Sequence, residues 1–516
     1  MVSVLHRPAT WERGRHRVPA PRRPAPWERA GQPWPAPPRP PGRAAARVRP
    51  LLLPAAAALL AYVAFLLVRG ALVDDAYITL TYVRNLAFHG HWGANLDGIS
   101  HTATSPLNVL VQAAVTVVVR DAVLAAGIVL AGLAALVTVW SRGVADELGW
   151  PRWTAALPVP LLVTNPLLLS TVGLETYLAI TLLVGLAYAA VARRVVLGGV
   201  LCGLLALTRP DLVVVAAVAA LAVPAFRRRL LTTVAAALAV SLPWYLVSWV
   251  VLGSIVPDTV LWKVGSSWGH TTFTNGLETY DRVFPTATTL ALLTAAAGIL
   301  GGLGWLLARR PGGAAVTVLG AGAVAHVVAF AALGTAPFHW YYGPAIGALT
   351  VLAAWSAGAL GGAVVRAVVA GALAVLVIAG ASFDLDHGTP WTVSPIESNW
   401  ATPAQYAYIA SYLQGKVGSA GELGTLAYFC GDRCAIDDSL SERAPMLARI
   451  AKQRAAAGPV EAALLDVNYR WLQPAPYVHA TTKLVMRKGW HPDGVNVGTP
   501  WSGRKNVILV PVNPSR

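Results

Sequence analysis

The sequence predicts a mainly α-helical fold: a polytopic membrane helix bundle of about eleven transmembrane helices, followed by a small extracytoplasmic α/β domain. Of the 516 residues, 56% are apolar and only 12% are charged, whereas soluble domains carry about 25% charged residues. The apolar residues gather in runs that match the length of a bilayer span, and this pattern stops after residue 383. An ordinary soluble enzyme, a disordered regulator and a fibrous repeat are thereby excluded.

The N-terminal segment 1–50 differs from everything that follows it. It holds eleven arginines and twelve prolines against two acidic residues, with little aliphatic content. Such a stretch cannot bury enough apolar surface to offset the entropy of ordering it, so we predict a disordered cytoplasmic tail. Much of the remaining positive charge lies in short clusters between apolar runs. Bilayer orientation explains these clusters better than nucleic-acid binding does, and no nucleic-acid partner is expected.

Residues 51–382 form the predicted membrane domain. If the tail is cytoplasmic and the chain changes sides at each run, every basic cluster, such as Arg227 to Arg229, falls on the cytoplasmic side. We therefore predict a multi-pass plasma-membrane protein with a cytoplasmic N-terminus. The predicted spans are 51–73, 106–140, 153–172, 175–192, 195–208, 211–225, 230–252, 286–307, 313–334, 343–360 and 364–382.

The segment 195–225 admits two interpretations. A single long helix would place the basic clusters at its two ends on opposite sides of the membrane, against the positive-inside rule. Two short helices that meet at Arg209-Pro210-Asp211 keep both clusters inside, and we favour them. Such short helices do not cross the whole core, so their tip should lie in a protein-lined cavity.

The C-terminal region 383–516 has the mixed pattern of an α/β domain. Thr402 and Pro403 form an N-cap and first-turn pair, which predicts a helix to about Val417. Strand-like runs follow at 423–429 and 506–512, and the stretch 441–457 is helical in pattern. Cys430 and Cys434 could form a local disulfide if this region faces an oxidising compartment.

Asp74 and Asp75, directly after the first run, are the leading candidates for catalysis. One of them could cap a helix over 76–88, but capping needs only one aspartate. Alternatively, one carboxylate acts as the base that deprotonates a hydroxyl group, while the other orients that hydroxyl or holds a divalent cation. No cofactor is certain; a cation such as Mg or Mn, bound by Asp74 or Asp75, stays open.

Two cations are candidates for binding phosphate. Arg209 lies at membrane depth beside Asp211, where an ionisable pair is costly and marks a functional site by default, although a structural ion pair explains it equally well. Lys263 lies on an outward loop and could pair with a phosphate as a point charge, or it could be an interfacial lysine beside Trp262. The aromatic segment 340–342 fits either the membrane aromatic belt or stacking on sugar rings.

Together these motifs resemble the GT-C class of integral membrane glycosyltransferases. Within the class they are most similar to the actinobacterial terminal arabinofuranosyltransferases. The similarity covers roughly residues 51–345. The motifs that carry it are Asp74-Asp75-Ala76-Tyr77-Ile78, Tyr82 to Leu86, Thr104 to Leu107, Gly173 to Thr176, Leu207 to Asp211, and Pro257-Asp258-Thr259 followed by Lys263.

The resemblance implies that a sugar, with arabinofuranose favoured, moves from a polyprenyl-phosphate donor to a cell-envelope glycan on the outer face. A mannose or glucose transferase is the alternative, and a lipid-linked-glycan flippase is less favoured because the two halves show no repeat. The sequence departs from the family in two places: Asp258 stands where the family has asparagine, and the C-terminal domain is short. The short domain bears on the acceptor, because it leaves less room for a module that binds a long glycan. The implied roles are catalysis for Asp74 and Asp75, donor-phosphate binding for Arg209, Lys263 and Arg84, and acceptor binding or support for Glu175, Asp211, Tyr82, His339 and Tyr342.

Overall fold

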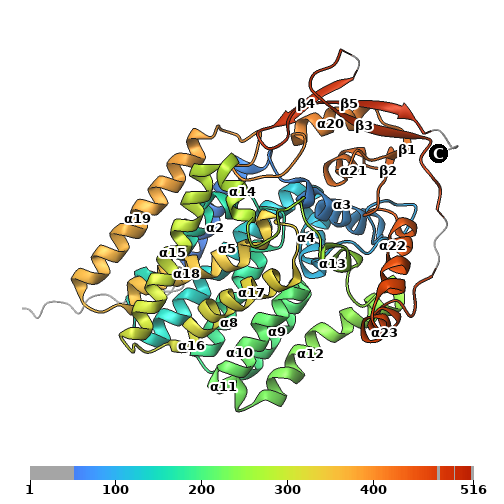
Figure 1. Cartoon of the computed structure of the whole chain (residues 1–516). Coiled ribbons are helices and arrows are strands. Elements are labelled where there is room, and N and C mark those ends of the chain that lie inside the picture. The colour runs from blue at the N-terminus through green and yellow to red at the C-terminus, as the bar shows by residue number, and fades with distance from the viewer. Residues whose placement is uncertain (1–50, 474–476, 493, 513–516) are drawn as a thin grey trace, which may run out of the picture. The chain divides into compact units, whose positions relative to one another are not determined.

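Long apolar helices dominate the computed structural model, which describes residues 51–473, 477–492 and 494–512 (Figure 1). The predicted tail 1–50 lies outside the described residues. Among those described, five helices are long and apolar enough to cross a membrane. They are α5 (Ala122–Leu148), α12 with its terminal π-helical turn (Leu230–Leu252), α15 (Pro285–Leu307), the α16–α17 helix (Gly313–Leu333) and α19 (Ala363–Asp386).

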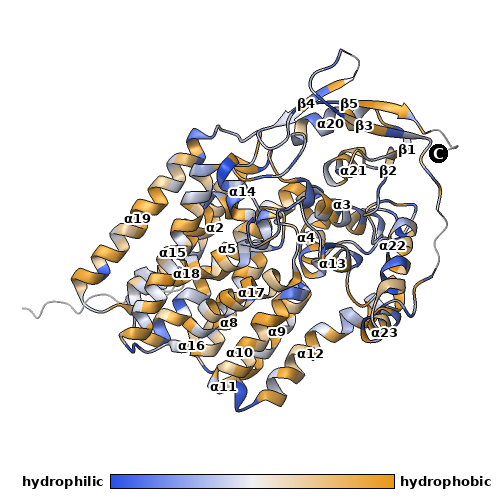
Figure 2. Cartoon of the chain, in the orientation of Figure 1, coloured by the Kyte–Doolittle hydropathy of each residue, from blue (hydrophilic) through white to orange (hydrophobic). Residues whose placement is uncertain are grey.

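Six further apolar helices of 10–17 residues occur in the described part of the chain. Their bounds are α2 (Leu52–Val68), α4 (Pro106–Val119), α8 (Thr176–Val191), α9 (Val195–Thr208), α10 with its preceding turn (Pro210–Ala222) and α18 (Gly343–Ala359). Helices α12 and α19 are buried over only 11% of their apolar windows. Figure 2 shows that apolar residues cover both, as expected of lipid-facing helices.

Two predicted spans are divided differently in the structure. The run 106–140 is not one helix, because Arg120 adopts a left-handed conformation and Asp121 caps the next helix, α5, through the Leu124 amide. The run 153–172 is also broken. Its prolines permit only a short turn, η3 (Arg152–Ala156), and the helices α6 (Pro158–Val163) and α7 (Pro166–Leu169).

The break predicted at Arg209 is confirmed. Helix α9 ends at Thr208, and Arg209 has an extended backbone before Pro210 starts the next turn. Proline disfavours helical geometry in the residue that precedes it, which explains why the two helices separate here. A single helix over 195–225 is therefore excluded.

Other elements lie between the apolar helices of the bundle along the chain. Helix α3 begins at Asp74 itself, two residues before the predicted helix 76–88, and neither aspartate caps it. The bounds of these elements are α3 (Asp74–His89), α11 (Pro224–Arg227), α13 (Asp258–Lys263), α14 (Gly276–Val283) and η7 (His339–Tyr341).

The C-terminal domain is built on a five-stranded mixed sheet of order β2-β1-β3-β5-β4. Strand β1 pairs in parallel with β2 and β3, and β5 is antiparallel to β3 and β4. The bounds are α20 (Pro403–Tyr412), β1 (Gly415–Gly418), α21 (Gly424–Cys430), β2 (Cys434–Asp437), α22 (Arg443–Ala456), α23 (Pro459–Asn468), β3 (Thr482–Lys488), β4 (Val495–Thr499) and β5 (Gly503–Pro511).

The predicted C-terminal elements agree in part. The helix that starts after Thr402 has the expected cap, closed by Gln405, but it ends at Tyr412 because β1 begins at Gly415. The run 423–429 is the helix α21 and not a strand. The Asp74 carboxylate accepts hydrogen bonds from the first two amides of this helix. The helical stretch 441–457 and the strand at 506–512 are found as α22 and the second half of β5. Cys430 and Cys434 form a disulfide.

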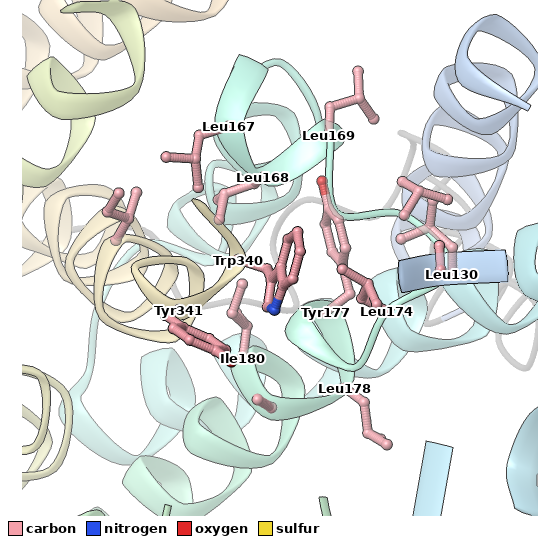
Figure 3. Close-up of a cluster of buried hydrophobic side chains, with 14 of the residues drawn as sticks. Leu130, Leu167, Leu168, Leu169, Leu174, Tyr177, Leu178, Ile180, Trp340 and Tyr341 are labelled. Carbon is pink, nitrogen blue, oxygen red and sulfur yellow. The ribbon is translucent and has the colours of Figure 1, made fainter. Parts of the chain in front are cut away.

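The core of the bundle surrounds the segment that precedes α18. Trp340 and Tyr341 are 4% exposed, and Figure 3 shows the Trp340 ring among Leu168 and Tyr177, with Tyr341 beside Ile180. Because close-packed side chains resist displacement, this cluster fixes the direction in which the aromatic segment 338–341 meets the candidate site.

Candidate active site

A cavity of about 560 Å³ lies between α3, α13 and the C-terminal domain. Asp74, Asp75 and Ile78 contribute from α3. Trp262 and Lys263 contribute from α13, and the segment 266–268 contributes from the loop after it. A hollow of this size is typical of small-ligand sites. Ala336 and Phe338 contribute from the segment before α18, and the C-terminal domain supplies Ser398, Asn399, Trp400, Gly421, Glu422, Leu423, Asp438, Leu440 and Trp501.

The Asp74 carboxylate forms its hydrogen bonds with the C-terminal domain. Its Oδ1 accepts hydrogen bonds from the Thr425 amide and hydroxyl, both at 2.8 Å, and its Oδ2 accepts one from the Gly424 amide at 3.0 Å. Its own amide donates to Asn399 Oδ1. A side chain at Gly424 would collide with the Asp74 backbone, so glycine permits the approach. Burial raises the pKa of Asp74, and these donors lower it in part.

Asp75 turns toward the cavity. Its carboxylate lies 3.6 Å from the Lys263 ammonium, and the side chain is 29% exposed. Burial raises the pKa of Asp75 above its ordinary value, the Lys263 charge lowers it, and the nearby Asp74 charge raises it. A carboxylate with a raised pKa, in reach of solvent and beside a cation, is equipped to accept a proton from a ligand hydroxyl.

Lys263 is the last residue of α13, and aromatic side chains lie around its ammonium group. Its ammonium is 5.2 Å from the ring centroid of Phe338, 5.7 Å from that of Tyr341 and 6.0 Å from that of Trp340. Burial alone lowers the pKa of Lys263, but Tyr341 and Asp75 outweigh this effect and raise it. The lysine therefore keeps its positive charge at the cavity wall, where it can meet an anion.

Arg209 does not reach the cavity wall. Its guanidinium donates to Glu175 at 2.8 Å and to Asp211 at 2.9 Å, and all three belong to a nearly closed network in the bundle. The guanidinium also lies 5.0 Å from the Tyr341 ring centroid. Arg209 and Lys263 therefore both lie beside the Tyr341 ring, and the arginine supports the ring that packs beside the lysine.

Arg84 and Tyr82 lie on α3 but away from the cavity wall. The Arg84 guanidinium donates to the carbonyls of Tyr428 and Gly431, so it holds the C-terminal domain against α3. The buried Tyr82 hydroxyl bonds Ser100 at 2.6 Å and Thr102 at 2.8 Å, which fixes the loop after α3.

His339 and Tyr342 are packing residues in this geometry. The His339 ring is fully buried beside the Tyr280 ring, and burial lowers its pKa to about 3, so it stays neutral. The Tyr342 hydroxyl donates to the Phe273 carbonyl at 2.6 Å, and its ring stacks on Phe273. The structure therefore gathers Asp75 and Lys263 at the cavity, with Asp74 alongside, and leaves the other predicted residues behind or outside it.

Sequence reasoning missed Glu422 and Trp400 of the cavity wall. The Glu422 carboxylate accepts the Trp400 amide at 2.9 Å and the Tyr406 hydroxyl. Burial and the neighbouring Asp74 raise the pKa of Glu422 well above its ordinary value. The only sequence signal was a polar and aromatic cluster at 397–400, in the segment between the last span and the helix that starts after Thr402.

The donor set does not fit a divalent cation held by protein side chains. Both Asp74 oxygens already accept hydrogen bonds, and Asp75 faces an ammonium group. Across the part of the chain that the structure describes, no group of three or more His, Cys, Asp or Glu side chains could hold a metal ion.

No protein-family model and no curated protein matches the sequence. Among solved structures, ArnT from Cupriavidus metallidurans bound to undecaprenyl phosphate aligns with a TM-score of 0.55 at 16% identity, over 90% of this chain and 98% of that chain. An Archaeoglobus fulgidus oligosaccharyltransferase in complex with Zn and sulfate aligns with a TM-score of 0.50 at 13% identity, over 84% and 67%. Arabinofuranosyltransferase AftD from Mycobacteria aligns at 0.49 and 16% identity, over 88% and 36%, which is too low to bear on the sugar.

The ArnT alignment spans nearly the whole of both chains, so the likeness includes the helix bundle and the C-terminal domain. The predicted fold class is confirmed by these neighbours. The chain has the fold of the GT-C membrane glycosyltransferases.

Proposed function

We propose that this protein is a membrane glycosyltransferase that moves a sugar from a polyprenyl-phosphate donor to a glycan acceptor on the extracytoplasmic face. The observation that carries the proposal is the Asp75–Lys263 pair, 3.6 Å apart, on the wall of a 560 Å³ cavity beside the membrane helices. A base next to a fixed cation suits the transfer of a group from a phosphate to a hydroxyl. The ArnT structure, which holds undecaprenyl phosphate, supports the lipid carrier.

In the proposed reaction, Asp75 removes the proton from the acceptor hydroxyl as its oxygen attacks the sugar's anomeric carbon. The bond from that carbon to the donor phosphate breaks, and the phosphate leaves on its lipid. Lys263 stabilises the negative charge that grows on the leaving phosphate, which is the point where electrostatic help lowers the barrier most. Asp74 holds the C-terminal wall and thereby the shape of the cavity.

The extracytoplasmic location is part of the proposal. The positive-inside distribution of arginine supports it. The Cys430–Cys434 disulfide supports it independently, because structural disulfides persist in oxidising compartments.

The sugar and the acceptor are proposed more narrowly from the sequence resemblance: an arabinofuranose and a cell-envelope glycan. Purified protein in proteoliposomes would be given radiolabelled polyprenyl-phosphate arabinofuranose, mannose or glucose together with envelope glycan. Label should enter the glycan with wild-type protein and not with Asp75→Asn, and the donor that works identifies the sugar. Equal labelling by both proteins would refute the proposed role of the cavity. Movement of donor between leaflets without labelled glycan would indicate a transporter.

A further inference from the structure

Helix α23 exposes a stripe of large apolar side chains. Val460, Leu464 and Val467 are 74%, 66% and 49% exposed, and Trp471, just after the helix, is 45% exposed. Spacings of four and three residues place the three aliphatic side chains on one side of the helix. Leu465 and Asn468 are the buried residues of α23, so the stripe is not the face by which the helix packs.

The stripe continues the surface of a membrane helix. Trp249, in the π-helical turn that ends α12, donates its indole N–H to the Val467 carbonyl at 2.8 Å, and its ring meets the Trp471 ring edge-on. On the same turn, Val250 and Val251 are 58% and 62% exposed. Figure 1 shows α23 beside the end of α12. The apolar side chains of α23 and the lipid-facing end of α12 therefore form one surface.

We propose that α23 is an interfacial helix whose apolar stripe lies in the membrane leaflet at which α12 ends. An amphipathic helix that is not long enough to span lies in the boundary between headgroups and acyl chains, with its apolar side down. Trp249 and Trp471 have the position of interfacial tryptophans. The Arg470 guanidinium, 5.6 Å from the Trp471 ring centroid, lies where lipid phosphates would meet it.

Hydrogen bonds link the end of α23 to the loop before α13, and thereby to the candidate site. Asn468 Oδ1 accepts the Ile255 and Val256 amides at 3.0 and 3.2 Å. The Tyr469 hydroxyl donates to Asp258 Oδ1 at 3.1 Å. Asp258 begins α13 and Lys263 ends it, so α23 fixes the helix that carries the lysine. On the proposed function, α23 holds Lys263 at the depth of the donor's phosphate.

The depth of α23 is measurable in the full-length protein. A nitroxide on Leu464→Cys is compared with one on Asp466→Cys, which lies on the side of α23 that faces α22 through its pairing with Arg454. The native cysteines do not compete for the label, because Cys202 is buried and the other two form the disulfide. The probes are lipid-soluble oxygen and a water-soluble nickel chelate, with the protein in nanodiscs of phosphatidylcholine and phosphatidylglycerol.

We expect the Leu464 label to collide several-fold more with oxygen, and several-fold less with the nickel chelate, than the Asp466 label does. Equal exposure of both labels to the chelate would overturn the interfacial helix. Asn468→Ala should raise the KM for the lipid donor several-fold without moving the Leu464 label, and an unchanged KM would overturn the link to α13. Failure of wild-type protein to transfer any sugar would contradict the proposed function and leave the depth measurement valid.

Discussion

Two charged clusters both lie beside the Tyr341 ring, and they differ in how far their charges are already paired and buried. Lys263 and Asp75 are 3.6 Å apart on a cavity wall, with 17% and 29% of their side chains exposed. Arg209 and Glu175 are 2.8 Å apart, and their side chains are 6% and 4% exposed. A partly solvated pair can exchange partners when a ligand arrives, whereas a closed pair is costly to open. The Asp75–Lys263 pair is therefore suited to bind a ligand and take part in a reaction, whereas the Arg209–Glu175 pair keeps a fixed arrangement in the bundle.

Asp75→Asn should have the largest effect, because it removes the base from the open cluster while keeping the shape of the side chain. We expect kcat for sugar transfer to fall by about 10²–10⁴-fold, the usual contribution of a positioned base. The measurement is transfer of radiolabelled sugar in proteoliposomes. An unchanged thermal midpoint would show that the fold survives, and near-normal kcat would assign the base elsewhere.

Arg209→Gln tests the closed cluster. Removing the cation leaves the buried Glu175 carboxylate without its partner, which should destabilise the protein by about 3–5 kcal/mol. Thermal unfolding in detergent measures the loss. The matched control is Arg152→Gln, because Arg152 pairs with Asp146 at 3.2 Å on the surface, and an exposed pair contributes about 0–1 kcal/mol. Similar losses in both variants would remove the distinction between the clusters.

Asp74→Ala tests whether the two adjacent aspartates have different roles, with Asp74 holding the C-terminal domain and Asp75 acting at the cavity. The variant removes the acceptor for three hydrogen bonds from Gly424 and Thr425. We expect a loss of about 1–3 kcal/mol, since unpaired buried donors cost this much. Limited proteolysis should release the C-terminal domain sooner than in Asp75→Asn. If Asp74→Ala instead abolished transfer with unchanged stability, Asp74 would be catalytic as well.

The pH profile gives the smallest and most specific effect. A base acts when deprotonated, so kcat/KM should fall as the pH drops through the raised pKa of Asp75. The Lys263 charge lowers this pKa and the Asp74 charge raises it. Lys263→Met should therefore move the acidic limb of the profile to higher pH, and Asp74→Asn should move it to lower pH. Shifts in the same direction would show that Asp75 does not control this limb.

Most of the bundle could be predicted from local sequence patterns, and the errors of the prediction have identifiable causes. Apolar run length identified the membrane helices, and proline chemistry identified the break at Arg209. The run 106–140 was joined wrongly because Arg120 and Asp121 interrupt it with only two residues. The run 423–429 looked like a strand, and the acceptor for the first amides of α21 is Asp74, which is 351 residues from Thr425 in sequence.

The sequence alone determined that this chain is a membrane helix bundle with a pair of carboxylates after its first helix and cations on later ones. Only the tertiary structure decided how those groups divide. Asp75 faces the cavity and Lys263, and Asp74 faces the C-terminal domain. Arg209 is buried in the bundle with Glu175. The physical reason is that hydrogen bonding and burial are set by the neighbours that folding brings together. Two adjacent residues of the same type carry no local signal that tells their surroundings apart.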